Sequence, residues 1–262
     1  MLAWSINLFR VFGIQLAVHV SFFLLLAYVG YEGWMEAALP GLLWSVGLIL
    51  IFFVCVILHE LGHSLTAQRY GVRVSRILLL PIGGMAEFDR IPRNPWQELV
   101  ITVAGPAVNF VLAGLFFVLS WRGLVNVEEV TPNSFASLLD TLWFWNLVMG
   151  AFNLLPVFPM DGGRILRALL ALKLPYLRAT YWAALVSKIL APVFAGVAFF
   201  VFDSKMLGVL FLFILFVGDA EYRLALRRDQ EERSWADLAR RAPMIKPASA
   251  GDEPPLILHG PN

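Results

Sequence analysis

The segment VILHELGHSL contains the residues with the clearest chemical signature in the chain. His59, Glu60 and His63 form an HExxH motif. Residues four apart on a helix share one face, so both imidazoles can reach a single metal ion while Glu60 points to an adjacent water. This arrangement is typical of zinc hydrolases, in which the metal and a carboxylate together activate water. The motif therefore predicts a hydrolytic metal centre.

The motif ends a long apolar run, and this setting strengthens the prediction. Ionisable side chains inside a membrane-spanning helix cost about 2.5–3.5 kcal/mol each on insertion scales, and they persist there mainly for function. The competing interpretation is that the three polar residues are simply packed between helices. We favour the metal centre over that alternative.

A catalytic zinc ion needs a third protein ligand, because it normally takes three and leaves a fourth position to water. Cys55 is the only cysteine, and the remaining histidines are His19 and His259. The stronger candidate is Asp161, which follows an apolar stretch and two prolines in NLLPVFPMDGGRIL. An alternative role for Asp161 is to cap the helix that follows, since aspartate is a favoured N-cap residue. We expect His19 to be a packing or gating residue.

The composition places these residues in a membrane protein. Hydrophobic residues make up 59% of the 262 residues and charged residues only 15%, against about 45–50% and 25% in soluble domains. A soluble enzyme is thereby nearly excluded. Lys and Arg number 20 and Asp and Glu 19, so the net charge of +1 gives no basic excess for a nucleic-acid partner. The apolar surface of the chain must face a lipid bilayer.

Six windows are long and apolar enough, or nearly so, to cross about 30 Å of hydrocarbon as helices. They are residues 13–31, 42–68, 98–121, 135–156, 178–201 and 204–221. We therefore predict an all-α polytopic membrane protein with six transmembrane helices. Residues 72–91 break this rhythm with β-branched residues and Pro81, Gly83 and Gly84, which favours short strands and a tight turn at the cytoplasmic membrane surface.

Arginine clusters indicate how the chain is oriented, because short cytoplasmic loops carry an excess of Lys and Arg. Such clusters follow the second, fourth and sixth windows, and the first of them includes Arg69, Arg73 and Arg76. Both termini are therefore expected in the cytoplasm. The second and fourth windows then both run towards the cytoplasm, which brings His59 and Asp161 into the same half of the bilayer.

The transmembrane domain is expected to occupy residues 1–221. Its first window is too long for the apolar core of a signal peptide, so we expect that window to remain in the mature protein. Residues 222–262 follow as a charged cytoplasmic helix and an end that we expect to be disordered.

The HELGH segment is followed by AGPAVNF in the third window and by NLLPVFPMDGG in the fourth. Together, in this order and spacing, these segments resemble the site-2 protease family of intramembrane zinc metalloproteases, over about residues 5–220. The resemblance implies that His59, His63 and Asp161 bind one Zn²⁺ per chain and that Glu60 is the general base. It is closest to the prokaryotic branch, and we expect neither the CBS pair nor the PDZ domain that some members carry.

The resemblance also implies an endopeptidase that hydrolyses peptide bonds of transmembrane substrates within the cell membrane, as in regulated intramembrane proteolysis. Glu60 would take the proton of a zinc-bound water and pass it to the leaving amine. Asn153 is our hypothesis for the donor to the developing oxyanion, with helix packing as the alternative. For Asn109 we favour a role in close helix packing near Gly105.

A substrate helix must unwind before its carbonyl can be attacked, because its amides are hydrogen bonded within the helix. Residues 72–91 could offer an edge strand to the unwound stretch, and Gly83 and Gly84 would permit that approach. A plain surface turn is the alternative.

Two other classes of function remain open. A membrane zinc transporter could use the same ligands to pass metal, but transporters usually show a repeated half, and this chain has one HExxH motif. An inactive relative that only binds membrane partners would not need Glu60 as a base. The sequence predicts no nucleic-acid partner and leaves homo-oligomerisation open.

Overall fold

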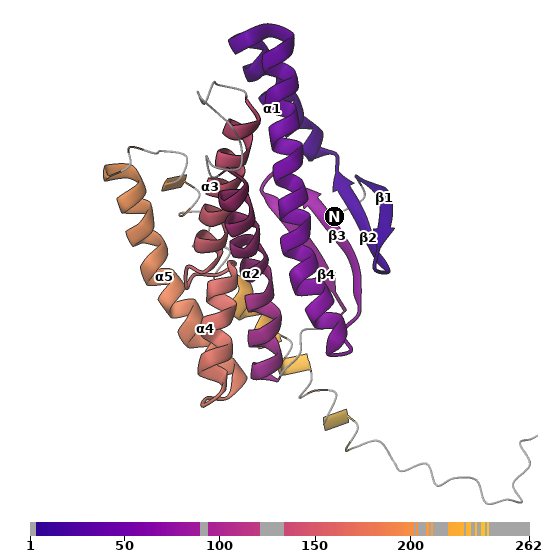
Figure 1. The fold of residues 1–262 in the computed structure, drawn as a ribbon. Coiled ribbons are helices and arrows are strands. Elements are labelled where there is room, and N and C mark those ends of the chain that lie inside the picture. The colour runs from indigo at the N-terminus through magenta and orange to yellow at the C-terminus, as the bar shows by residue number, and fades with distance from the viewer. Residues whose placement is uncertain are drawn as a thin grey trace, which may run out of the picture.

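The computed structural model describes residues 4–89, 94–120 and 134–201, and short stretches between 203 and 240. Its helices form an upright bundle, and a small sheet lies along one side of that bundle (Figure 1). Among the described residues, four helices are long and apolar enough to cross a membrane. They are α1 (Ser21–Arg69), α2 (Pro95–Ser120), α3 (Phe135–Asn153) and α5 (Tyr176–Phe200).

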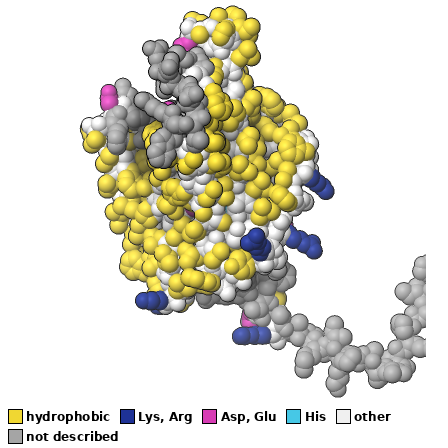
Figure 2. All heavy atoms as spheres, viewed as in Figure 1, with side chains coloured by type: hydrophobic (Ala, Val, Ile, Leu, Met, Phe, Trp, Pro, Cys, Tyr) yellow, Lys and Arg dark blue, Asp and Glu magenta, His cyan; other side chains and the backbone are white. Residues whose placement is uncertain are grey.

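The outer surface of the bundle is apolar. Figure 2 shows hydrophobic side chains over most of one face, while the Lys and Arg side chains on that face gather towards its lower part and the sheet. Large apolar residues such as Leu24 and Val111 are 72% and 70% exposed. A surface of this kind is stable in lipid and not in water. The chain is a multi-pass membrane protein.

Helix α1 consists of two antiparallel arms. Its helical backbone is interrupted at Ala37 and at Ala38, which has a positive φ of 50°. The rings of Phe22 and Phe53, one on each arm, pack edge to face with their centroids 4.6 Å apart. These arms overlap the predicted windows 13–31 and 42–68, and together they form one of the four helices that are long and apolar enough to cross a membrane.

The start of the first predicted window was wrong. Residues Ile14–His19 form strand β2, and the helix begins only at Ser21. Most of β2 is buried and it pairs with another strand, so cross-strand hydrogen bonding overrides an apolar run that is continuous with the helix.

The later windows agree better with the structure. The predicted windows 98–121, 135–156 and 178–201 match α2, α3 and α5 to within three residues at each end. Helix α3 ends at Asn153, shortly before Pro156. Most of the sixth window, residues 204–221, lies outside the described residues.

A four-stranded sheet lies against the second arm of α1. Its strands are ordered β1 (Ser5–Val11), β2 (Ile14–His19), β3 (Val74–Leu80) and β4 (Gly83–Phe88). β2 and β3 are parallel, and the two outer pairs are antiparallel. The strands predicted within residues 72–91 are confirmed as β3 and β4. The predicted fold is confirmed in part, because the described chain is mostly helical; the all-α description omitted β1 and β2, which complete a four-stranded sheet.

The sheet and α1 share a hydrophobic core. Leu16 of β2 and Ile77 of β3 pack with Leu61 and Ala67 of α1, and all four side chains are buried. This core fixes the end of α1 that contains the HExxH motif relative to the sheet.

A short helix, α4 (Asp161–Ala171), carries the third candidate ligand and is held by a buried ion pair. Arg167 is 1% exposed, and its Nε and one terminal nitrogen donate to Oε1 of Glu98 on α2 at 2.8 and 2.5 Å. Its other terminal nitrogen donates to Glu221 at 3.0 Å. The guanidinium also lies over the rings of Phe158 and Tyr176, 5.3 and 5.2 Å from their centroids. Arg167 thus joins α4 to α2 and to the helical stretch at residues 220–227.

We predict that Arg167→Leu destabilises the fold, because it leaves Glu98 as a buried charge without its partner. The expected loss is about 3–5 kcal/mol in the free energy of unfolding. Thermal or denaturant unfolding of the purified chain in detergent micelles measures it. Arg76→Leu is the matched control, because Arg76 makes a similar pair with Glu87 at the surface of the sheet, at 2.8 and 2.9 Å, and such pairs contribute about 0–1 kcal/mol. Equal losses in the two variants would contradict the prediction.

Candidate metal centre

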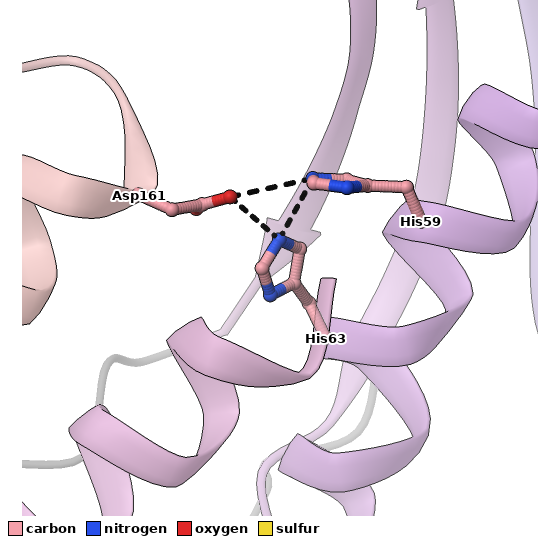
Figure 3. A group of neighbouring side chains, drawn as sticks. All are labelled: His59, His63 and Asp161. Carbon is pink, nitrogen blue, oxygen red and sulfur yellow. Dashed lines mark hydrogen bonds and ion pairs between the residues drawn. The ribbon is translucent and has the colours of Figure 1, made fainter. Parts of the chain in front are cut away.

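His59, His63 and Asp161 converge inside the bundle (Figure 3). The Nε2 atoms of the two histidines are 3.1 Å apart, and each lies 3.3 Å from Oδ2 of Asp161. All three residues are buried, with 3%, 7% and 8% of their surfaces exposed. The two histidines come from the second arm of α1 and the aspartate from the first position of α4. The structure therefore brings together the three residues that the sequence predicted as ligands.

The donor set fits a zinc ion. Zn–N bonds of about 2.0–2.1 Å at tetrahedral angles require ligand atoms about 3.3 Å apart, close to the separations seen here. Oδ2 of Asp161 is buried and makes no hydrogen bond within the described part of the chain. A buried carboxylate oxygen without a donor is costly unless a cation neutralises it. The separations of the ligand atoms and the unpaired Oδ2 of Asp161 both indicate that the cluster can bind a metal ion.

The far nitrogens of both rings are hydrogen bonded, which leaves the near ones free for a metal. Nδ1 of His63 lies 2.8 Å from the backbone carbonyl of Ile101. Because a carbonyl only accepts, this Nδ1 carries the proton and Nε2 carries the lone pair. Nδ1 of His59 lies 2.5 Å from Oδ1 of Asn109. Asn109 therefore contacts a ligand, in addition to the helix-packing role that the sequence favoured for it.

Glycines allow α1 and α2 to approach closely at this level. A side chain on Gly105 would overlap the ring of His63, and one on Gly62 would come within 2.8 Å of the carbonyl oxygen of Ala104. The AGPAVNF segment thus provides a flat surface for His63. Its small residues are the sequence signal for this contact.

The structure does not support helix capping as the role of Asp161. Asp161 is the first residue of α4, and Met160 occupies the cap position. The side chain of Asp161 points towards the two histidines (Figure 3).

Glu60 lies between the metal cluster and the edge of the sheet. A Cβ added at Gly84 would lie 2.6 Å from Cγ of Glu60 and 3.2 Å from its Oε1. Gly84 belongs to β4, the last strand in the order, so β4 is an edge strand in the described sheet. The Glu60 side chain, which belongs to the same helix as the two candidate histidine ligands, therefore also lies next to a strand that is at the edge of the described sheet.

The other predicted residues lie farther from the chemistry. Nδ2 of Asn153 donates to the backbone carbonyl of Met149 at 3.1 Å, within the last turn of α3. Nδ1 of His19 lies 2.7 Å from the hydroxyl of Ser21 at the start of α1. No described contact of either residue reaches the metal cluster.

A small cavity adjoins His63. Its volume is about 30 Å³, and its lining includes Glu98, Thr102 and Arg164. Oε2 of Glu98 and Nε of Arg164 are buried and have no partner among the described residues. A cavity needs about 10–15 Å³ and polar partners to hold a water molecule, so this space can hold water beside the cluster.

Comparison with known proteins agrees with this geometry. The chain is 40% identical over 222 residues to a zinc metalloprotease of Methanocaldococcus jannaschii, which covers 84% of this chain and 61% of the relative. It is 36% identical over 172 residues to a putative zinc metalloprotease of Synechocystis, covering 63% of this chain and 44% of that one. It is 31% identical over 244 residues to the putative zinc metalloprotease Rip3 of Mycobacterium tuberculosis, covering 87% and 59%. The chain thus spans less than two thirds of the length of these relatives.

A solved structure and a family model complete the comparison. The site-2 protease of M. jannaschii matches with a TM-score of 0.61 and 39% identity, covering 84% of this chain and 95% of that chain. The model of peptidase family M50 matches residues 47–128 and 122–194. The first of these segments contains His59 and His63, and the second contains Asp161. The chain belongs to peptidase family M50, the family of the site-2 proteases.

Proposed function

We propose that this protein is an intramembrane zinc metalloendopeptidase that hydrolyses peptide bonds of transmembrane substrates, as in regulated intramembrane proteolysis. The observation that carries the proposal is the buried cluster of His59, His63 and Asp161, with Glu60 beside it, inside an apolar bundle. One Zn²⁺ per chain is held by these three ligands. The names of the relatives, zinc metalloprotease and site-2 protease, agree with this reaction.

The chemistry divides between the metal and Glu60. When bound, zinc supplies a Lewis acid that polarises the peptide carbonyl and lowers the pKa of water towards about 7. Glu60 accepts the proton of the attacking water at its carboxylate and returns it to the nitrogen of the leaving amine. The water reaches the ligands from the cavity lined by Glu98 and Arg164.

Asn153 is the proposed donor to the oxyanion that forms during attack. It is the last residue of α3 and lies eight positions before Asp161 in the sequence. Its amide donates to the carbonyl of Met149 in the structure. The proposed role therefore requires the side chain to rotate towards the substrate when it binds.

The proposed substrate contact is the outer edge of β4 at Gly83 and Gly84, which has no partner strand among the described residues. An unwound segment of a substrate can add to an edge strand through backbone hydrogen bonds. Because Gly84 packs against Glu60, a segment paired there lies close to the general base. The absence of a side chain at Gly84 lets the Glu60 side chain lie directly against this strand.

The arginine clusters support a location in the cell membrane with both termini in the cytoplasm. In this orientation the second arm of α1 ends at the cytoplasmic side, with Arg69 in its last turn. The window 204–221 is the proposed sixth crossing. The cluster then lies in the cytoplasmic half of the bilayer.

We predict that Glu60→Gln abolishes most cleavage and keeps zinc, because glutamine has the same shape but cannot take a proton. Loss of a general base reduces the rate by about 10²–10⁴-fold. Cleavage of a model single-spanning protein in proteoliposomes gives the rate, and elemental analysis of the purified chain gives zinc content. Glu36→Gln, an exposed position on the other arm of α1, is the control and should cleave normally. Undiminished cleavage by Glu60→Gln would refute the base assignment, whereas a wild-type chain that binds zinc and cleaves nothing would favour a transporter or binding protein.

We predict that Asp161→Asn weakens zinc binding, because the amide removes the negative charge and leaves the volume unchanged. The expected loss of affinity exceeds about 100-fold, more than for residues that merely contact a ligand. Competition with a chromogenic chelator measures it. Asp140→Asn, at an exposed position of α3, is the matched control. Wild-type affinity in Asp161→Asn would show that Asp161 is not a ligand.

We predict that Gly84→Ala slows cleavage without loss of zinc. The added methyl group pushes on Cγ of Glu60, and a displacement of about 1 Å in a catalytic group can cost up to 100-fold in rate. Turnover in proteoliposomes and zinc content are the two measurements. Gly47→Ala, where nothing lies within 4 Å of the new Cβ, serves as the control. Turnover equal to that of the wild type would show that the contact between Gly84 and Glu60 does not position the carboxylate for catalysis.

A further inference from the structure

A line of hydrogen bonds runs from His59 across three helices. Nδ1 of His59 on α1 lies 2.5 Å from Oδ1 of Asn109 on α2. Nδ2 of Asn109 donates to Oδ1 of Asn146 on α3 at 3.0 Å. Nδ2 of Asn146 in turn donates to the backbone carbonyl of Leu142 at 2.8 Å. Both asparagines have 0% of their surface exposed, so water does not compete for these bonds.

The direction of every bond in this line follows from its last member. The carbonyl of Leu142 can only accept, so Asn146 must present its NH₂ group there and its oxygen to Asn109. Asn109 must then donate with its own NH₂ group, which turns its oxygen towards His59. Nδ1 of His59 must therefore carry a proton. The lone pair of this ring is left on Nε2, the atom that faces Asp161 and His63.

We propose that Asn146 is a positioning residue for the metal site, which acts through Asn109 to fix the tautomer and ring orientation of His59. Asn146 belongs to neither of the motifs that carry the candidate ligands, and it does not touch the cluster. The proposal rests on the proposed zinc site and is independent of the proteolytic reaction. Its tests therefore measure metal binding and not cleavage.

The packing around the two amides supports a fixed orientation. The second bond of the Asn109 NH₂ group goes to the sulfur of Met149, 3.5 Å away. A Cβ at Gly150 would come within 3.3 Å of Cβ of Asn109, so the glycine lets α3 lie close against α2 here. Rotation of the Asn109 amide by 180° would place its NH₂ group against the N–H of His59 and leave both without acceptors. Such unsatisfied donors are costly at membrane depth.

The first test is the zinc dissociation constant of Asn146→Ala, measured on the full chain in detergent by chelator competition. Without the acceptor from α3, the Asn109 amide can turn, and His59 is no longer confined to one tautomer. Residues that orient a metal-bound histidine typically contribute 10–100-fold to affinity, so the expected loss is about 10–100-fold. Thr180→Val, which removes a buried hydroxyl on α5 that donates to the backbone carbonyl of Tyr176 in the same helix, should bind zinc as the wild type does. Wild-type affinity in Asn146→Ala would overturn the proposal.

The second test separates orientation from packing. In Asn109→Asp, the carboxylate has only acceptors, so it accepts from His59 whichever way it is turned and no longer needs Asn146. The proposal therefore expects Asn146→Ala to cause no further loss of zinc affinity when it is combined with Asn109→Asp. If the loss caused by Asn146→Ala is the same in both backgrounds, Asn146 acts by packing alone and the proposal is wrong.

A third variant covers the case in which Asn146→Ala does not fold. Asn146→Asp keeps an acceptor for Asn109 and gives up the bond to Leu142. The expected result is zinc affinity within about threefold of the wild type, small against the 10–100-fold effect of losing the acceptor, together with a lower melting temperature of the metal-free chain. A loss of affinity as large as that of Asn109→Ala would overturn the proposal.

Discussion

The position of α4 against α2 is the constraint on which the site depends, because Asp161 is the only proposed ligand that does not belong to α1. The two histidines share one helical face and need only the helix to bring them together. Asp161 lies about a hundred residues later in the chain, and its place is set by the buried pair between Arg167 and Glu98. Only one turn and a half of α4 separates Asp161 from Arg167, so a shift at the ion pair moves the carboxylate by a similar amount.

The apolar surroundings explain why nearly every polar group at this site has a hydrogen-bond partner. Inside a bilayer, an unpaired donor or acceptor has no water to bond with, so each one must find a protein partner or a cation. The far nitrogens of both histidines, the two asparagine amides and the guanidinium of Arg167 all meet this condition. Oδ2 of Asp161 and Oε2 of Glu98 do not meet it within the described residues. The first of these oxygens faces the proposed metal position, and the second belongs to a residue that lines the cavity beside His63.

The sequence identified the candidate ligands that converge in the structure, and most of the helices, because both are local or nearly local patterns. The spacing of His59 and His63 is a property of one helix, and Asp161 follows two prolines that end an apolar run. Strands β1 and β2 were not predicted, since the apolar run of β2 continues into α1 and only its pairing with β1 and β3 distinguishes the two. Asn146 could not be recognised at all, because an asparagine in a spanning helix acquires its role from residues on two other helices. Residues 90–93 and 121–133 lie outside the described part of the chain, and nothing in the structure bears on the predictions made for them.

The parallel pairing of β2 with β3 joins the two ends of α1. Strand β2 leads into the first arm and β3 follows the second, and the pairs from Gln15 with Arg76 to Val18 with Leu79 close the chain into a ring. The arm that bears His59 and Glu60 is thereby fastened to the sheet whose outer strand lies beside Glu60. A change in bilayer thickness or lateral pressure that tilts this arm carries the strand edge with it. The spacing between the Glu60 carboxylate and the edge of β4 therefore depends on the backbone hydrogen bonds between β2 and β3 and not on the surrounding lipid.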